Sequence, residues 1–312
     1  MLTATFDLGL KTDPIQNRYS FAWLFDLLTS ENVRHIQFAS FPEMYWLDDS
    51  WFVEVRRAAE ERGLRVRSVL ASHRETGGFF HGDVRFARVA RKTHERLIEV
   101  AALLGAEYCG SNAGSVWRDR PDNLRSGLEC YYSHMEELMA VAHRAGLRAL
   151  TIEPMSCSVE PPSTPSEISE MMGRFAAHHQ AYRESTVPVY LCGDIAHGVC
   201  DAERRVLYNH EELFVHGIPW MAEFHLKNTD AIFNATFGFG AADRARGIVD
   251  PAGLRRICDR HADRFPVPEV VGYLELPGPK FGRDYSDPLL GPMLTESLRA
   301  LRQEFLLQCK AE

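Results

Sequence analysis

The chain has 312 residues, of which 45% are hydrophobic and 25% are charged. This balance is typical of a globular protein with a full core, so disordered and fibrous proteins are excluded. The formal net charge of −8 disfavours a nucleic-acid partner, because affinity for nucleic acids depends mainly on cationic side chains that neutralise phosphates.

The cysteines and the N-terminal residues indicate a cytoplasmic protein. No C-x-x-C pair occurs, and an odd number of cysteines cannot all pair within one chain, so we predict reduced thiols. The first seven residues lack the cationic and apolar regions of a signal peptide. No apolar run approaches the roughly 18 residues that span a bilayer, so we predict no membrane partner. The seven cysteines are Cys109, Cys130, Cys157, Cys192, Cys200, Cys258 and Cys309.

A helix that ends at a glycine and leads into an apolar, β-prone run recurs along the chain. The glycines are Gly63, Gly105 and Gly146, which lie 42 and 41 residues apart. Glycine can adopt the left-handed conformation that ends a helix, so each one predicts a turn from helix to strand. The spacing is close to the ~40 residues per unit that an eightfold barrel of this length would use.

Taken in chain order, the β-prone runs predict strands near residues 3–8, 34–39, 65–71, 106–111, 147–153, 188–194, 220–226 and 270–276. Helices are predicted between them, among others at 50–62 with Ser50 as N-cap, 122–145, 166–179 and 290–308. Alternating strands and helices form a parallel sheet. An open doubly wound sheet is the alternative, but no G-x-G-x-x-G follows the first strand. We therefore predict an α/β protein, a (β/α)8 TIM barrel that occupies residues 1–312 as one domain.

Four residues of metal-ligating types lie at the carboxyl ends of four successive predicted strands: Glu153, Asp194, His225 and Glu275. In a parallel barrel these ends meet at one rim, so the side chains can share a centre. Taken singly, each has an ordinary alternative as a cap or a solvated residue. Three carboxylates and one imidazole together suit one divalent ion, Mn²⁺, Mg²⁺, Co²⁺ or Zn²⁺.

The chain resembles the xylose-isomerase-like TIM barrels, which include sugar-phosphate isomerases and epimerases, ketose 3-epimerases and endonuclease IV. The resemblance covers most of the chain and is strongest from 147 to 278. It implies that Glu153, Asp194, His225 and Glu275 are metal ligands, that His197 binds substrate, and that the protein is a homo-oligomer. Its motifs are Ile152-Glu153-Pro154, Asp194-Ile-Ala-His197, Phe224-His225-Leu-Lys227-Asn228, Arg246-Gly247-Ile-Val-Asp250 and Leu274-Glu275-Leu276.

A metal that chelates a carbonyl and a neighbouring hydroxyl acidifies the C–H between them and stabilises an enediolate. We therefore predict an isomerase or epimerase that acts on a small sugar or sugar phosphate. Glu153 and Glu275 could flank the enediolate, one removing and the other returning a proton, which are the roles the resemblance to ketose 3-epimerases implies. An aldose–ketose isomerase would need a proton shuttle along one face only.

Further side chains near the predicted strand ends could bind substrate. His73 and Arg74 follow the third strand, and a solvated loop pair is the alternative. Lys227 and Asn228 follow His225; Lys227 could polarise a substrate oxygen or bind a phosphate, or form a salt bridge to a loop. The loop 228–240 resembles that of tetrulose-phosphate racemases and isomerases, which implies a short-chain ketose phosphate.

Three other functions stay open. An endonuclease IV-like phosphodiesterase is disfavoured, because the fourth-strand region Tyr108–Asn112 has no histidine and Asp230 does not begin an Asp-x-His motif. A sugar dehydratase would use the same metal and enediolate. A non-catalytic sugar-binding barrel would tolerate the loss of a ligand, whereas all four are present, and fold alone does not imply function.

Overall fold

The computed structural model describes residues 3–305, and eight parallel strands of this part form a closed barrel. The barrel order is β1-β10-β9-β6-β5-β4-β3-β2. This confirms the predicted α/β barrel. Its strands are β1 (Thr5–Lys11), β2 (His35–Ala39), β3 (Arg65–Ala71), β4 (Tyr108–Asn112), β5 (Ala149–Glu153), β6 (Val189–Asp194), β9 (Met221–Leu226) and β10 (Glu269–Leu274).

By its internal contacts the chain divides into two compact units. The first unit comprises Met1–Gln37, Arg57–Arg65 and Gly193–Glu312, and the second comprises Phe38–Arg56 and Val66–Cys192. The assignment of the whole chain to one domain stays a prediction.

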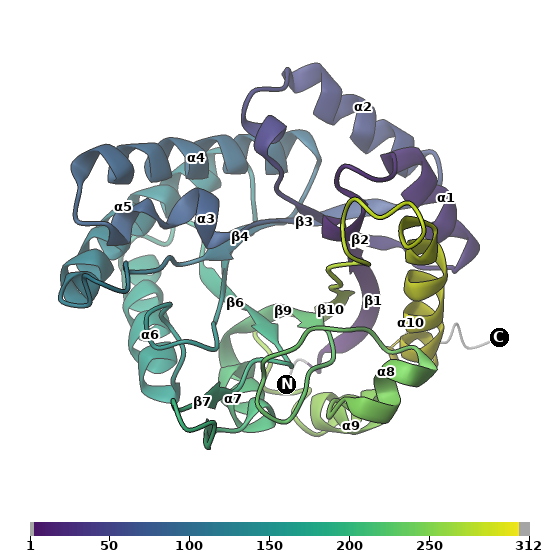
Figure 1. Ribbon diagram of the computed structural model, residues 1–312. Helices are drawn as coiled ribbons and strands as arrows, with labels where there is room; N and C mark the ends of the chain where they lie inside the picture. Colours follow the sequence, from purple (N-terminus) through teal and green to yellow (C-terminus); the bar gives the residue numbers. More distant parts are fainter. Residues whose placement is uncertain (1–2, 306–312) are drawn as a thin grey trace. The chain divides into compact units, whose positions relative to one another are not determined.

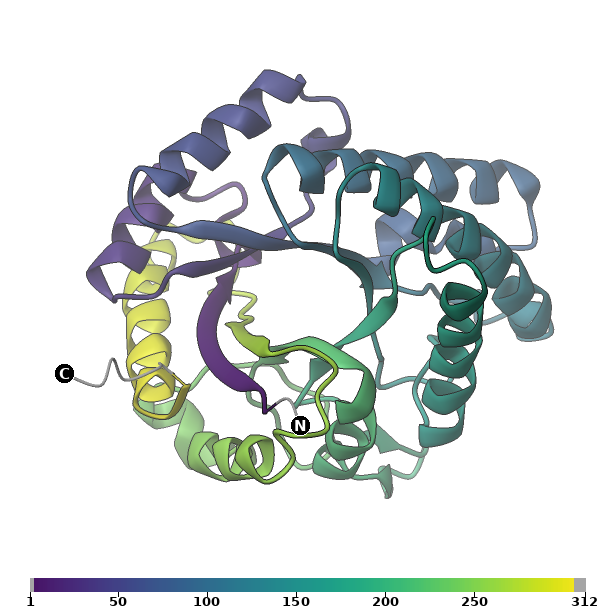
Figure 2. The same cartoon turned by 180° about the vertical axis from the view of Figure 1, so that it is seen from behind.

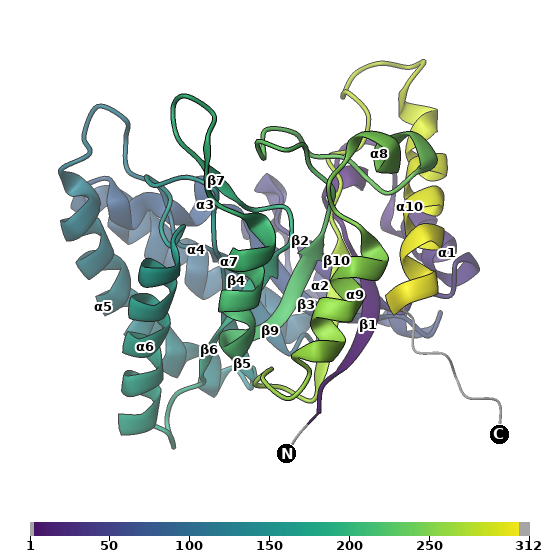
Figure 3. The same ribbon diagram turned by 90° about the horizontal axis from the view of Figure 1, so that it is seen from below.

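In the first unit, β1 pairs in parallel with β10 and β2, and β10 pairs with β9. The helix α10 (Leu290–Phe305) packs on β1, β10 and α9 (Pro251–Arg260) with buried leucines such as Leu294 and Leu298. The unit also contains α1 (Phe21–Ser30), α7 (His210–Gly217) and α8 (Ala241–Arg246). Figure 3 shows α8 and the loop after β10 at the end of the unit to which these parallel strands run.

A close approach inside the first unit explains one glycine. Gly9 of β1 is the register partner of Tyr273 of β10. A Cβ on Gly9 would lie 2.5 Å from the Cδ1 atom of Tyr273, so only glycine leaves room for this fully buried ring. The ring fills space between the strands and so contributes to the core.

In the second unit, β4 lies between β3 and β5, and β5 pairs with β6. Its main helices are α4 (Val84–Leu103), α5 (Asn123–Arg144) and α6 (Pro165–Ala181), and α3 (His73–Thr76) is a single turn. Helices α4 and α5 pack against each other, as Figures 1 and 2 show from opposite sides. Thr164 caps α6 in a reciprocal capping box with Glu167, which fixes where that helix begins.

The predicted turns are confirmed, because Gly63, Gly105 and Gly146 have φ values of 71°, 71° and 81°. The prediction that Ser50 is an N-cap is wrong, since α2 (Asp49–Glu60) begins one residue earlier and includes it. The sequence reading also missed the antiparallel hairpin of β7 (Val199–Cys200) and β8 (Val206–Tyr208). These strands are too short to show an alternating pattern.

The six cysteines in the described part are thiols rather than disulfides, and three of them, Cys109, Cys192 and Cys258, are buried. Cys309 lies outside the described residues. No helix between residues 3 and 305 is long and apolar enough to cross a membrane.

Candidate metal centre

The ends of β6, β9 and β10 position three of the predicted ligands in the first unit. Asp194 is the last residue of β6, His225 lies one residue before the end of β9, and Glu275 directly follows β10. The Ile195 amide is 3.5 Å from the carbonyl oxygen of His225, and the Glu275 amide donates to the carbonyl of Leu226 at 3.0 Å. These backbone contacts place the three side chains at one end of neighbouring strands.

The imidazole of His225 lies between the two carboxylates. Its Nδ1 atom is 3.5 Å from Oε2 of Glu275 and 3.8 Å from Oδ2 of Asp194. The side chains of His225 and Asp194 are fully buried, and that of Glu275 is 16% exposed. Burial this deep means that the charges of the carboxylates must be balanced locally.

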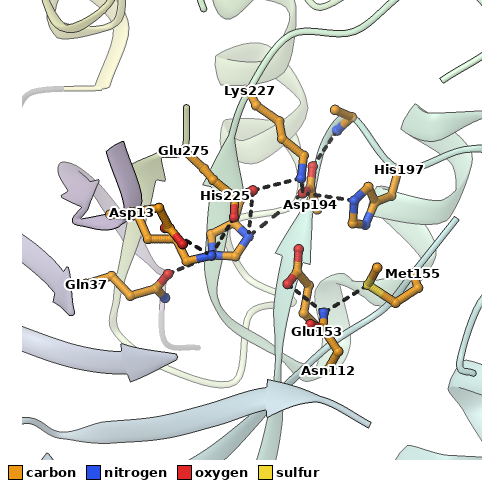
Figure 4. A network of polar contacts seen from close by, with 12 residues as sticks. Asp13, Gln37, Asn112, Glu153, Met155, Asp194, His197, His225, Lys227 and Glu275 are labelled. Carbon is orange, nitrogen blue, oxygen red and sulfur yellow. Dashed lines mark hydrogen bonds and ion pairs between the residues drawn. The ribbon is translucent and has the colours of Figure 1, made fainter. Parts of the chain in front are cut away.

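The fourth predicted ligand, Glu153, is the last residue of β5 in the second unit. Its Oε2 atom accepts a hydrogen bond of 2.8 Å from the side-chain amide of Asn112, which ends the neighbouring strand β4. Asn112 also contacts the sulfur of Met155, as Figure 4 shows. Glu153, Asp194, His225 and Glu275 form a buried cluster in which each offers one ligand atom, and these atoms lie within 4.8 Å of one another.

A glutamine determines which nitrogen of His225 faces the cluster. The Nε2 atom of His225 is 2.7 Å from Oε1 of Gln37, a fully buried residue of β2. An amide oxygen only accepts hydrogen bonds, so Nε2 carries a proton and Nδ1 is the nitrogen that faces the carboxylates, where it would bind a metal once it is deprotonated. Such a partner fixes both the tautomer and the orientation of a metal-binding histidine.

Two lysines neutralise the carboxylates of the first unit. The ammonium of Lys227 is 2.5 Å from Oδ2 of Asp194 and 2.7 Å from Oε2 of Glu275. The ammonium of Lys11 is 2.5 Å from Oε1 of Glu275 and 3.3 Å from Oδ2 of Asp13. Figure 4 shows Lys227 reaching between Asp194 and Glu275. Both oxygens of Glu275 therefore have a cationic partner.

These charges keep two ligands ionised. Burial alone would raise the pKa of Asp194, but His197, Lys227 and the hydrogen bond with His225 hold it below its usual value. Burial would also raise the pKa of Glu275, yet His225, Lys11 and Lys227 hold it well below the usual range. Two carboxylates that stay ionised in a buried site are prepared to bind a cation.

The donor set fits a divalent ion. Gln37 directs Nδ1 of His225 toward the site, and the carboxylates present oxygens, as hard and borderline divalent ions require. Asp194, His225, Glu275 and Glu153 would hold such an ion, which would supply Lewis acidity toward a substrate oxygen.

The residues predicted to bind substrate differ in where the structure places them. His197 lies beside the cluster, with Nε2 at 3.3 Å from Oδ2 of Asp194. Asn228 is fully buried, and its side-chain oxygen accepts from the backbone amides of Thr229 and Val249, so it organises its own loop. His73 and Arg74 belong to α3, but their side chains lie outside the described part of the structure.

Sequence reasoning assigned no role to Gln37 and Asn112. Each occupies a position near the carboxyl end of a predicted strand, which is the signal that identified the four ligands. Amides are poor candidates for ligands of a catalytic metal, so this signal alone predicts no metal-binding role for them. Their contacts show instead that they orient His225 and Glu153.

A second cluster of ligand types occurs near the opposite ends of the strands. Asp7, His35 and Glu269 each offer an atom within 4.8 Å of the others. The Nε2 atom of His35 is 3.0 Å from Oδ2 of Asp7 and 3.8 Å from Oε1 of Glu269. His35 and Glu269 begin β2 and β10. These positions are remote from the carboxyl ends of strands where barrel enzymes place their catalytic groups.

Comparison with solved structures identifies proteins that share the fold over nearly the whole chain. No curated protein matches the sequence. A protein from Rhodospirillum rubrum, provisionally named xylose isomerase, has a TM-score of 0.78 and 19% identity, with coverage of 96% of this chain and 99% of that one. The D-psicose 3-epimerase of Clostridium cellulolyticum H10, solved with D-tagatose, has a TM-score of 0.70 and 12% identity over 96% and 100% of the chains.

A third relative is the IOLI protein, solved with a bound zinc atom. It has a TM-score of 0.66 and 12% identity, with coverage of 96% of this chain and 100% of that one. At these identities the likeness shows the fold alone. The family model described as "Xylose isomerase-like TIM barrel" matches residues 30–262. Because that match spans most of the sequence, the chain belongs to the xylose isomerase-like TIM barrel family.

Proposed function

We propose that the protein is a metal-dependent isomerase or epimerase that acts on a small ketose or ketose phosphate through an enediolate. The observation that carries this proposal is the buried cluster of Glu153, Asp194, His225 and Glu275. The D-psicose 3-epimerase among the structural neighbours, solved with a ketohexose, supports a small sugar as substrate. The bound metal would polarise the substrate carbonyl and stabilise negative charge on the enediolate oxygens.

The two glutamates have different surroundings, which supports different roles. Both oxygens of Glu275 contact lysine ammonium groups, and its pKa is held well below the usual range, so it is a weak base and carries a proton poorly. Glu153 is oriented by the neutral amide of Asn112. We therefore assign removal of the substrate proton to Glu153, and binding of the metal to Glu275. This division favours proton transfer along one face of the substrate.

His197 is the most suitable of the remaining predicted residues to contact substrate. It lies three residues after Asp194, and its Nε2 atom contacts that carboxylate. A substrate hydroxyl beside the metal would be within reach of the same imidazole. Lys227, once away from the carboxylates, would offer an ammonium to a substrate oxygen or phosphate. The short-chain ketose phosphates implied by the loop 228–240 are the first substrates to test.

Proton exchange measured by NMR tests this function. The enzyme, loaded with Mg²⁺ for NMR, is incubated in D₂O with C4–C6 ketoses and their phosphates. We expect deuterium to enter the carbon next to the carbonyl, and we expect Glu153→Gln to lose exchange by a factor of roughly 10² or more. Glu153→Asp is the matched variant, because it keeps a carboxylate and should retain part of the activity.

The same experiment separates the other functions. A dehydratase would remove water from its substrate, and the carbonyl product would be detected by its ultraviolet absorbance. A phosphodiesterase would leave every sugar unexchanged and cleave an abasic oligonucleotide. A binding barrel would perturb a ligand's resonances without either reaction. Exchange that survives unchanged in Glu153→Gln would contradict the role assigned to Glu153.

A further inference from the structure

The ammonium of Lys227 contacts the carboxylate oxygens of Asp194 and Glu275 that a metal would bind. It contacts Oδ2 of Asp194 at 2.5 Å and Oε2 of Glu275 at 2.7 Å. The same two oxygen atoms face Nδ1 of His225, at 3.8 and 3.5 Å. The imidazole and the ammonium are thus directed at one pair of oxygens. Lys227 is only 8% exposed, so its charge is held inside the protein rather than in solvent.

A metal ion and this ammonium compete for the same positions. Divalent ions bind carboxylate oxygens and imidazole nitrogens at about 2.0–2.2 Å. An ion on both oxygens would therefore lie less than about 5 Å from Nζ of Lys227 if the lysine kept its contacts. Two positive charges that close, with little water between them, repel strongly. The two arrangements are therefore alternatives.

We propose that Lys227 is an internal counter-ion that replaces the metal's charge in the metal-free protein. It binds the Asp194–Glu275 pair when no metal is bound, and metal binding displaces it. The displaced ammonium then becomes available to a substrate oxygen, so that metal loading completes the substrate site. This inference rests on the proposed function, because it requires that the cluster binds a divalent ion.

Lys11 provides an internal comparison. Its ammonium contacts Oε1 of Glu275, the other oxygen of that carboxylate, and Oδ2 of Asp13 as well. The oxygen of Glu275 that faces Nδ1 of His225 is Oε2, whereas Lys11 is paired with Oε1 and is also held by Asp13. Lys11 therefore need not move when a metal binds. Lys227 is the lysine on the two oxygens that face the imidazole, and so it is the one expected to compete with the ion.

Metal titration of the chelator-treated protein tests the inference without relying on activity. Co²⁺ or Mn²⁺ is titrated calorimetrically into wild type, Lys227→Met and Lys11→Met. We expect Lys227→Met to bind the ion about 5- to 150-fold more tightly than wild type, the range of typical coupling between linked sites. Lys11→Met removes an attraction to Glu275 without removing a competitor for those oxygens, so a smaller gain is expected.

Thermal melting gives a second readout. Without metal, Lys227→Met should melt at a lower temperature than wild type, because two buried carboxylates lose their counter-ion. Saturating metal should remove most of that difference. Lys227→Gln, which keeps a polar side chain, is tested in parallel, so that a folding defect of the methionine variant does not decide the result.

The outcomes separate the inference from the proposed function. Equal or weaker metal binding by both Lys227 variants, with wild type binding normally, overturns the counter-ion role alone. If wild type binds no divalent ion, or if His225→Ala binds it as tightly as wild type, the proposed metal centre fails and the inference fails with it. The His225→Ala comparison also distinguishes this centre from the Asp7–His35–Glu269 cluster.

Discussion

At the scale of single residues, Gln37 determines which nitrogen of His225 faces the carboxylates. Its amide oxygen accepts from Nε2 at 2.7 Å and so leaves Nδ1 available to a metal. We expect Gln37→Leu to weaken metal binding about 10- to 100-fold, the usual effect of removing such a partner. Gln37→Glu keeps an acceptor at the same position and should bind metal far better than the leucine variant. Metal titration of both variants checks this, and equal affinities would refute the tautomer argument.

The grouping of the four predicted ligands could be foreseen from the sequence, because each follows an apolar run and barrel topology brings such positions to a common rim. The lysines on Glu275 could not be assigned in the same way. Lys227 was predicted to lie near the site, but its contact with both Asp194 and Glu275 depends on side-chain conformation. Asn228 stood in the same motif, yet its carboxamide turns toward the backbone of Val249. The neighbouring residues Lys227 and Asn228 thus have different roles: the lysine contacts the carboxylates, and the asparagine organises its own loop.

At the scale of secondary-structure elements, His94 links α4 to β4 in the second unit. Its Nδ1 donates to the carbonyl of Ala90 at 2.9 Å, and its Nε2 lies 3.3 Å from the hydroxyl of Ser111 on β4. Burial is the largest influence and lowers the pKa of His94 to about 4 from an ordinary 6.5. The folded protein therefore holds His94 neutral at pH values where the unfolded chain protonates it.

The stability of this helix–strand contact should depend on pH. Above pH 6.5 both states are neutral and the full stability is present. Between pH 6.5 and 4 the unfolded state binds more protons, so this residue lowers the free energy of unfolding by about 3 kcal/mol in all. His94→Gln can keep both hydrogen bonds but cannot titrate. Urea unfolding between pH 4 and 7 should show a shallower slope for the glutamine variant, and identical slopes would contradict the assignment.

At the scale of the whole molecule, the β-prone runs, three of them preceded by a helix that ends at a glycine, were enough to predict eight barrel strands. Gly63, Gly105 and Gly146 adopt the left-handed conformation that the pattern requires, so local preference and topology agree. The pattern gave no sign of β7 and β8, whose exposed residues Val206 and Leu207 resemble a loop as much as a strand. The first strand was predicted to end at residue 8, whereas β1 continues to Lys11, a charged residue that is buried against the usual rule.

Metal binding should stabilise the molecule as a whole, because the ligands Asp194, His225 and Glu275 lie at the ends of three strands that are far apart in sequence. A ligand that binds only the folded state at about 100 times its Kd adds about 2.7 kcal/mol to the free energy of unfolding. For a chain of this size, with an unfolding entropy of about 2.1 cal/mol/K per residue, that corresponds to a rise in Tm of about 4 °C. Calorimetry of chelated and Mn²⁺-loaded protein measures the rise. His225→Ala should abolish this rise in Tm while leaving a folded barrel, because the metal can then no longer link the ends of the three strands. If the chelated and loaded wild-type proteins melted together, the cluster would act as an internal ion network without a metal.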